Sequence, residues 1–277
     1  MNPEDLQSFL LWLVPLLAIT GLVGGILAGL LGVGGGIVIV PVLYHVFDYL
    51  GIDDAIRMHL AVGTSLATII PTSIRSVRAH QKRHSFDATL FRAWAPGIFV
   101  GVIIGTWLAS MATFSALTSV FAVVAMIVAI HMGFGNKDLV VSQEAPKGAI
   151  RAALTTFIGA ISTMMGIGGG TLSVPLMTLF GVPIHRAVGT AAGLGMVIAI
   201  PGVIGFMVGG WNATGLPPAS IGYVNWLGFL LIVPATVLAV PLGAHLAHSL
   251  DPQPLRRVFA AFLALTAARM LWDVFSL

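Results

Sequence analysis

Two runs of glycine interrupt otherwise apolar stretches of this 277-residue chain. A helix that starts directly after such a turn has free backbone N–H groups and a positive dipole end, and glycine lets the backbone approach a ligand closely. The runs therefore predict an anion-binding site made of backbone groups, at Gly34, Gly35, Gly36, Gly168, Gly169 and Gly170. The alternative is that these glycines only let helices pack closely.

Hydroxyl side chains stand beside these glycines and beside two glycines further along the chain. A tetrahedral oxyanion needs several hydrogen-bond donors, which hydroxyls and backbone N–H groups supply. Each hydroxyl could instead bond to a carbonyl of its own helix, and both interpretations are open. The candidate anion contacts are Thr171 after the second run, Thr64 and Ser65 after Gly63, and Thr190 after Gly189.

Ionisable residues are scarce inside the apolar segments. All ten carboxylates lie in polar stretches or near segment ends, so none is placed to bind a cation or relay protons at mid-membrane. His45 is a candidate proton donor or anion contact, with a buried neutral histidine as the alternative. Arg75 either touches the substrate or extends its side chain to the cytoplasmic surface. We therefore expect a small anionic substrate, no metal and no cofactor.

The composition is that of a membrane protein. Hydrophobic residues make up 57% of the chain and charged residues only 8%, with a mean hydropathy of +1.00. A soluble chain carries about 25% Asp, Glu, Lys and Arg, so this chain cannot cover a folded surface with charge and needs the lipid bilayer as its partner. The net charge of +3 comes from basic residues in short loops, as in membrane bundles, and does not indicate nucleic-acid binding.

Apolar runs of crossing length set the organisation of the chain. A crossing helix needs about 20 residues, and runs near that length lie at 60–77, 92–112, 115–134, 187–209, 223–248 and 254–275. Residues 9–50 and 151–181 are also apolar but are cut by glycines, which predicts two broken or re-entrant hairpins. The predicted fold is an all-α polytopic membrane protein with about 8–10 apparent transmembrane segments.

Three motifs recur in the same order in the two halves of the chain. The matched pairs are Gly29–Pro41 with Thr163–Pro175, Ala61–Thr64 with Ala187–Thr190, and Val120–Ala122 with Val258–Ala260. They predict a first transmembrane repeat at residues 1–134, a cytoplasmic linker at 135–150 and a second repeat at 151–277. Each repeat is expected to hold one glycine-broken hairpin and three membrane-spanning helices.

Loop charges predict that the two repeats have inverted topology. The loop after the third segment of the first half carries Arg78, Lys82 and Arg83, whereas the equivalent loop of the second half, residues 210–222, carries no charged residue. Under the positive-inside rule the first loop is cytoplasmic and the second external. Both chain termini are then expected outside. Inverted repeats with broken helices are typical of transporters that work by alternating access.

The glycine hairpins Leu31-Gly-Val-Gly-Gly-Gly-Ile37 and Met165-Gly-Ile-Gly-Gly-Gly-Thr171, each leading to a Val-Pro pair, resemble the TauE/SafE sulfite exporter family, as do the two Ala-Val-Gly-Thr blocks. The resemblance extends from about residue 15 to residue 270. It implies a multi-pass protein of the bacterial inner (cytoplasmic) membrane. It also implies a secondary transporter of small sulfur-containing anions such as sulfite or organosulfonates, for example sulfoacetate.

Other classes of function are weighed against this one. A passive anion channel or a non-catalytic membrane subunit of a larger complex is the main alternative, and a homo-oligomer fits either. An intramembrane enzyme is disfavoured, because the sequence contains no His-Glu-x-x-His and no Gly-x-Ser-x-Gly motif.

Overall fold

The computed structural model describes residues 3–32, 34–134, 141–142, 145–249 and 253–276. Within these residues the chain is almost entirely α-helical, and seven helices are long and apolar enough to cross a membrane. Three further apolar helices are shorter. The all-α polytopic fold predicted from the sequence is therefore confirmed.

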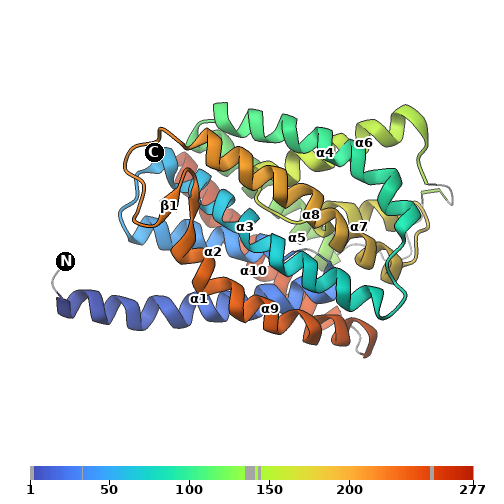
Figure 1. Ribbon diagram of the computed structural model, residues 1–277, viewed down its shortest axis with the longest axis horizontal. Helices are drawn as coiled ribbons and strands as arrows, with labels where there is room; N and C mark the ends of the chain where they lie inside the picture. Colours follow the sequence, from blue (N-terminus) through green and yellow to red (C-terminus); the bar gives the residue numbers. More distant parts are fainter. Residues whose placement is uncertain (1–2, 33, 135–140, 143–144, 250–252, 277) are drawn as a thin grey trace.

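Each half of the chain contributes five helices (Figure 1). The first half contains α1 (Pro3–Leu31), α2 (Gly36–Tyr49), α3 (Asp54–Gln81), α4 (Ala88–Met111) and α5 (Phe114–Phe134). The second contains α6 (Gly148–Met164), α7 (Gly170–Leu179), α8 (Ile184–Gly209), α9 (Trp226–Ser249) and α10 (Gln253–Phe275). A small antiparallel hairpin of β1 (Ser220–Ile221) and β2 (Val224–Asn225) lies between α8 and α9.

Helix α6 begins inside the segment predicted to be the cytoplasmic linker, and the bounds of that linker and its side of the membrane stay predictions. Helix α6 already begins at Gly148, so the last residues of the 135–150 segment are helical. Residues 135–140 and 143–144 of that segment lie outside the described residues.

Each half begins with a helix, a glycine break and a short helix. Helices α2 and α7 have 14 and 10 residues. At about 1.5 Å per residue both are too short for a hydrocarbon core of about 30 Å. The breaks contain glycines with positive φ, among them Gly34 at 76° and Gly166 at 65°, a conformation that a side chain disfavours. The predicted breaks are present, although α1 contains a full candidate span at Trp12–Leu30.

Rows of glycine bring two pairs of helices together at backbone distance. The row on α1, which faces α9, consists of Gly21, Gly25 and Gly29. The row on α4, which faces α6, consists of Gly97, Gly101 and Gly105. A Cβ on Gly29 would lie only 2.6 Å from the backbone N of Ala244. Small residues at this spacing allow close helix contact in a membrane, and here both contacts join one half of the chain to the other.

Helices α3 and α8, which carry the two Ala-Val-Gly-Thr motifs, pack against each other and run antiparallel. Near the start of α3, Gly63 faces Phe206 near the end of α8, while further along α3 Ser73 faces Gly195. Helix α3 is also the most enclosed of the candidate spans, with 78% of its most apolar window buried against 28% for α10. An inverted repeat requires this antiparallel course, but the inverted topology and its orientation across a membrane stay predictions.

Candidate functional site

The glycine turns of the two halves touch inside the fold. A Cβ on Gly34 would lie 3.1 Å from Cα of Gly168, and a Cβ on Gly36 would overlap the carbonyl oxygen of Gly166. All four glycines are buried. Nothing larger than glycine fits between the turns, so the structure brings together the two runs that the sequence singled out.

Both turns lead directly into a short helix, α2 at Gly36 and α7 at Gly170. The N-cap residues, Gly35 and Gly169, offer no side-chain hydrogen bond to the first turn of either helix. The first N–H groups of a helix lack partners within the helix and carry the positive end of its dipole. Two uncapped helix starts therefore lie at one buried region, an arrangement suited to an anion.

Ser65 lies between the two turns. Its hydroxyl donates a 2.7 Å hydrogen bond to the carbonyl oxygen of Gly166. A Cβ on Gly36 would lie 3.0 Å from the same Oγ atom. Because the hydroxyl hydrogen is already used, Ser65 positions the second turn against α3.

Three buried hydroxyls near the start of α7 have no hydrogen-bond partner among the described residues: those of Ser73, Thr171 and Ser173. Their side chains belong to residues that are at most 4% exposed. Ser73 comes from α3, and Gly195 of α8 makes room for it. A Cβ on Gly195 would lie 2.5 Å from Ser73 Oγ and 3.7 Å from the backbone N of Gly169.

Sequence reasoning selected Thr171 but did not select Ser73. A signal was present, because α3 carries an unusual series of hydroxyl residues for an apolar helix: Thr64, Ser65, Thr68, Thr72, Ser73 and Ser76. Two of these bond back to their own helix, Thr68 to Ser65 and Thr72 to Thr68. Which of these residues reach the other half of the chain could not be told from the sequence without the packing.

Thr64 and Thr190 each contact the start of a helix from the other half. The backbone N–H of Asn225 donates a 2.8 Å hydrogen bond to Thr64 Oγ1. The backbone N–H of Asp87 donates a 3.2 Å bond to Thr190 Oγ1. We refer to these as the Thr64 contact and the Thr190 contact. The alternative interpretation assumed that each threonine hydroxyl bonds to a carbonyl of its own helix, and neither Thr64 Oγ1 nor Thr190 Oγ1 does so.

The two contacts share further details. Asn225 and Asp87 each use a side-chain oxygen to accept from a backbone N–H three residues on, at 2.8 Å from Gly228 and 3.0 Å from Leu90. Both residues thus cap the helix that follows, α9 in one case and α4 in the other. The glycine before each threonine lies against the segment that contains the bonded residue, Asn225 or Asp87. A Cβ on either glycine would overlap a backbone carbonyl of that segment.

The Thr190 contact includes charge, whereas the Thr64 contact is neutral. Asp87 forms an ion pair with Arg186. Burial raises the pKa of the Asp87 carboxyl, but the hydrogen bonds from Leu90 and Arg186 outweigh it and leave the pKa below its ordinary value. The Asn225 amide instead donates 3.0 Å bonds to Pro218 O and Ser220 Oγ in the segment that holds β1.

The Ala-Val-Gly-Thr motif is in fact two residues longer on its N-terminal side. His59 and His185 occupy the same place in the two copies, a match that sequence reasoning missed. His59 is buried, and its Nε2 donates a 2.9 Å bond to the carbonyl oxygen of Ala109 at the end of α4. Its ring lies 4.9 Å from that of Tyr223, whereas His185 is exposed.

His45 and Arg75 do not join the glycine turns. His45 is half-buried on α2, edge-on to the Tyr44 ring at a centroid distance of 5.1 Å. Arg75 is exposed on α3, while the turns are buried. The described residues contain no group of three or more His, Cys, Asp or Glu side chains that could hold a metal.

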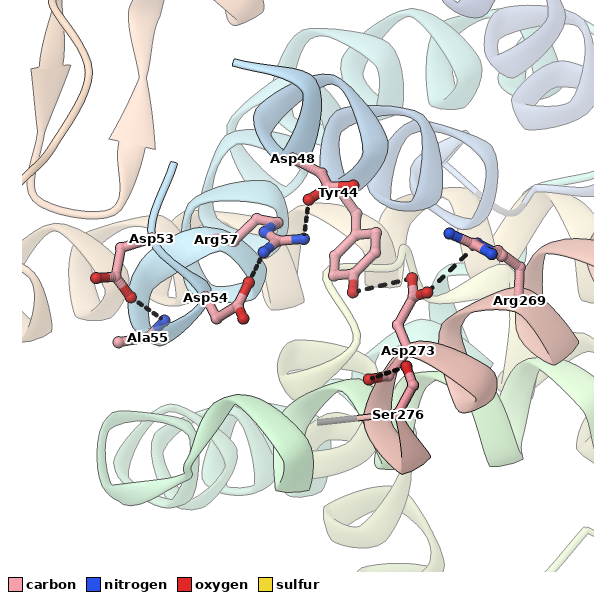
Figure 2. A network of polar contacts seen from close by, with 9 residues as sticks. All are labelled: Tyr44, Asp48, Asp53, Asp54, Ala55, Arg57, Arg269, Asp273 and Ser276. Carbon is pink, nitrogen blue, oxygen red and sulfur yellow. Dashed lines mark hydrogen bonds and ion pairs between the residues drawn. The ribbon is translucent and has the colours of Figure 1, made fainter. Parts of the chain in front are cut away.

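A polar network ties α2, α3 and α10 together at one end of the bundle (Figure 2). Arg57 of α3 pairs with Asp48 at 2.5 Å and also with Asp54. Its guanidinium lies 5.3 Å from the centroid of the Tyr44 ring, whose hydroxyl donates a 3.4 Å bond to Asp273 of α10. Sequence reasoning missed Arg57, whose role depends on these three helices meeting.

A cavity of about 370 Å³ lies between α4 and α8. Its lining is mostly apolar and includes the exposed side chains of Ile103, Trp107 and Val208. None of the glycine turn residues lines it. We therefore do not assign it to the candidate site.

The seven candidate membrane spans among the described residues and the extensive packing between the two halves define a polytopic α-helical membrane protein. The sequence profile of the family described as Sulfite exporter TauE/SafE matches residues 17–270. The chain belongs to this family, as the sequence motifs had indicated.

Curated relatives match nearly the whole chain. A probable membrane transporter protein of Haemophilus influenzae is 33% identical over 91% of this chain and 96% of its own length. A probable membrane transporter protein of Methanocaldococcus jannaschii is 28% identical over 96% of this chain and 98% of its own length. The probable membrane transporter protein YunE of Bacillus subtilis is 26% identical over 93% of this chain and 97% of its own length. No solved structure gives a significant match. The relatives support a general membrane-transporter function.

Proposed function

We propose that the chain is a secondary transporter of small sulfur-containing anions, such as sulfite or an organosulfonate like sulfoacetate. The observation that carries the proposal is the contact between Gly34 and Gly168, which places two uncapped helix starts at one buried region. An anion that leaves water must have its lost hydrogen bonds replaced. Backbone N–H groups and hydroxyls replace them without a full positive charge, so the ion can also be released. The family supports a sulfur oxyanion as the substrate.

The Thr64 and Thr190 contacts suit an alternating-access cycle. The first lies beside the β-hairpin, near the start of α3, and the second lies at the start of α4, beyond the far end of α3. Opening one contact while the other holds would expose the glycine turns to one side of the membrane at a time. In this proposal the protein lies in the cytoplasmic membrane of a bacterium, with the loop at Arg78 to Arg83 inside and both termini outside.

Counterflow in proteoliposomes tests the proposal. Purified protein is reconstituted, and uptake of sulfite, sulfoacetate, taurine and sulfate is measured with and without unlabelled anion inside, using protein-free liposomes as the control. A carrier gives saturable uptake that internal anion accelerates. Flux without acceleration would favour the passive anion channel. Absence of flux for every sulfur anion, in protein that is folded and inserted, would refute the proposal.

A further inference from the structure

The two glycine turns are alike in sequence, but the helices that follow them differ chemically. In the alignment of the two runs, Thr171 and Ser173 of α7 correspond to Ile37 and Ile39 of α2. All four residues are buried. The first turn of α7 therefore carries hydroxyls where the first turn of α2 carries only hydrocarbon.

The helices that face the two turns show the same difference, since the first turn meets hydrocarbon and the second meets a hydroxyl. A Cβ on Gly34 would lie 3.3 Å from Cγ2 of Ile69, so an isoleucine of α3 covers the first turn. In the alignment of the Ala-Val-Gly-Thr motifs, the residue of α8 that corresponds to Ile69 is Gly195. Gly195 lies against Gly169 and leaves space that the Ser73 hydroxyl approaches. One turn is covered by hydrocarbon, and the other is open to a hydroxyl.

The hydroxyls at the second turn are donors that no group among the described residues uses. Buried polar side chains normally have a partner, yet Ser73, Thr171 and Ser173 have none in the described part of the chain. They accompany the uncapped N–H groups of a ten-residue helix. The side chains that a Cβ on a turn glycine would meet are neutral, as is Ser73 beside Gly195: Val40, Ser65, Ile69, Val188 and Leu194. The donors are therefore numerous but carry no full charge.

We propose that the start of α7, with Ser73, Thr171 and Ser173, forms the charged-group half of the substrate site and takes a monovalent oxyanion group. This inference rests on the proposed function. Neutral donors and one helix dipole stabilise the single negative charge of a sulfonate group or of hydrogen sulfite. Sulfate instead carries two charges on one group, and none of the described side chains that meet the turns is a cation that would offset the second charge. The start of α2, with Ile37 and Ile39, supplies the apolar side of the site.

Binding to the purified full-length protein in detergent tests the inference, with methanesulfonate and sulfate as probes and calorimetry as the readout. The hydroxyl variants are Ser73→Ala, Thr171→Val and Ser173→Ala, with Thr171→Val as the reference because it keeps the side-chain shape. The matched control is Thr118→Val, which removes a buried hydroxyl on α5 that has no hydrogen-bond partner among the described residues and lies outside the proposed site. The thermal midpoint of each variant reports its fold.

We expect the wild-type protein to bind methanesulfonate more tightly than sulfate. Each hydroxyl variant should bind methanesulfonate about tenfold more weakly, as expected for one hydroxyl bond to a charged group, while the Thr118→Val control binds normally. Unchanged affinity in the folded hydroxyl variants would overturn the assignment to α7, and sulfate binding as tight as methanesulfonate binding would overturn the charge preference. Neither result touches the proposed function, which fails instead if the wild-type protein binds no sulfur oxyanion.

Discussion

The backbone N–H of Asn225 donates a hydrogen bond to Oγ1 of Thr64, 161 residues earlier in the chain. The backbone N–H of Asp87, in the first half of the chain, likewise donates a hydrogen bond to Oγ1 of Thr190, in the second half. In both cases the donor is the residue that caps the next long helix. The repeated Ala-Val-Gly-Thr motif is thus explained by contact between the halves, because glycine permits the approach and threonine accepts the bond.

Replacing Thr64 with valine should destabilise the fold, because the buried N–H of Asn225 loses its acceptor while the side-chain volume is kept. We expect a loss of about 1–3 kcal/mol, measured as a lower midpoint of thermal unfolding in detergent. Thr190→Val should act in the same direction. Thr118→Val is the control, since that buried hydroxyl has no hydrogen-bond partner to lose within the described part of the chain. Weaker substrate binding at an unchanged midpoint would favour direct substrate contact by Thr64 instead.

Gly34→Ala separates backbone strain from the contact between the turns. Gly34 and Gly51 have similar positive φ angles of 76° and 69°, but a Cβ on Gly51 would meet nothing within 4 Å. Gly51→Ala should therefore cost only the backbone term, about 1–2 kcal/mol. Gly34→Ala should cost about 1–3 kcal/mol more, because the methyl group is forced toward Gly168, and it should abolish transport. Equal midpoints and normal transport in the two variants would show that the turns do not need this contact.

The charged Thr190 contact should make stability depend on pH. The pKa of Asp87 is lower in the folded protein than its ordinary value of 3.8, so the ionised carboxyl stabilises the fold above that pH. This stabilisation is lost as the pH falls below 3.8 through the folded-state pKa. Asp87→Asn keeps a capping side chain, as Asn225 shows at the other contact, and should unfold with a flatter pH profile in that window. The free energies of unfolding of the wild-type protein and Asp87→Asn should differ by no more than about 1 kcal/mol, because Arg186 is largely exposed.

The membrane orientation can be tested with single cysteines, because the natural chain contains none. Gln81 and Thr214 are both exposed, and Thr214 avoids the positive φ of neighbouring Gly215. An impermeant thiol reagent added to intact cells should label Thr214→Cys and leave Gln81→Cys unlabelled until the membrane is opened. Labelling of both cysteines from the same side would contradict the inverted repeat.

The helices and glycine breaks could be predicted because they depend on local features of the sequence. Apolar length defines a span, and a run such as Gly34 to Gly36 interrupts it. The difference between the turns was also visible, since Ile37 and Thr171 occupy matched positions. The chemical meaning of that difference required the packing.

The partners of the motif residues could not be predicted, because they come from distant segments. Nothing near Thr64 in the sequence points to Asn225, and nothing near Gly169 points to Ser73. These contacts depend on the antiparallel packing of α3 and α8 and on where a missing Cβ leaves room. A repeat aligned in sequence identifies equivalent residues, but it does not tell which half supplies the partner.

The glycine rows on α1 and α4 have a consequence for how the chain can be divided. Each row packs at backbone distance against a helix of the other half, α9 or α6, so each half by itself would expose a face that is shaped for its partner helix. We therefore expect that neither half of the chain folds on its own. Residues 1–142 expressed alone should be degraded or aggregate, whereas coexpression with residues 143–277 should recover both fragments as one complex. In the proposed transport cycle, the bodies that move would accordingly be mixed units, each assembled from helices of both halves.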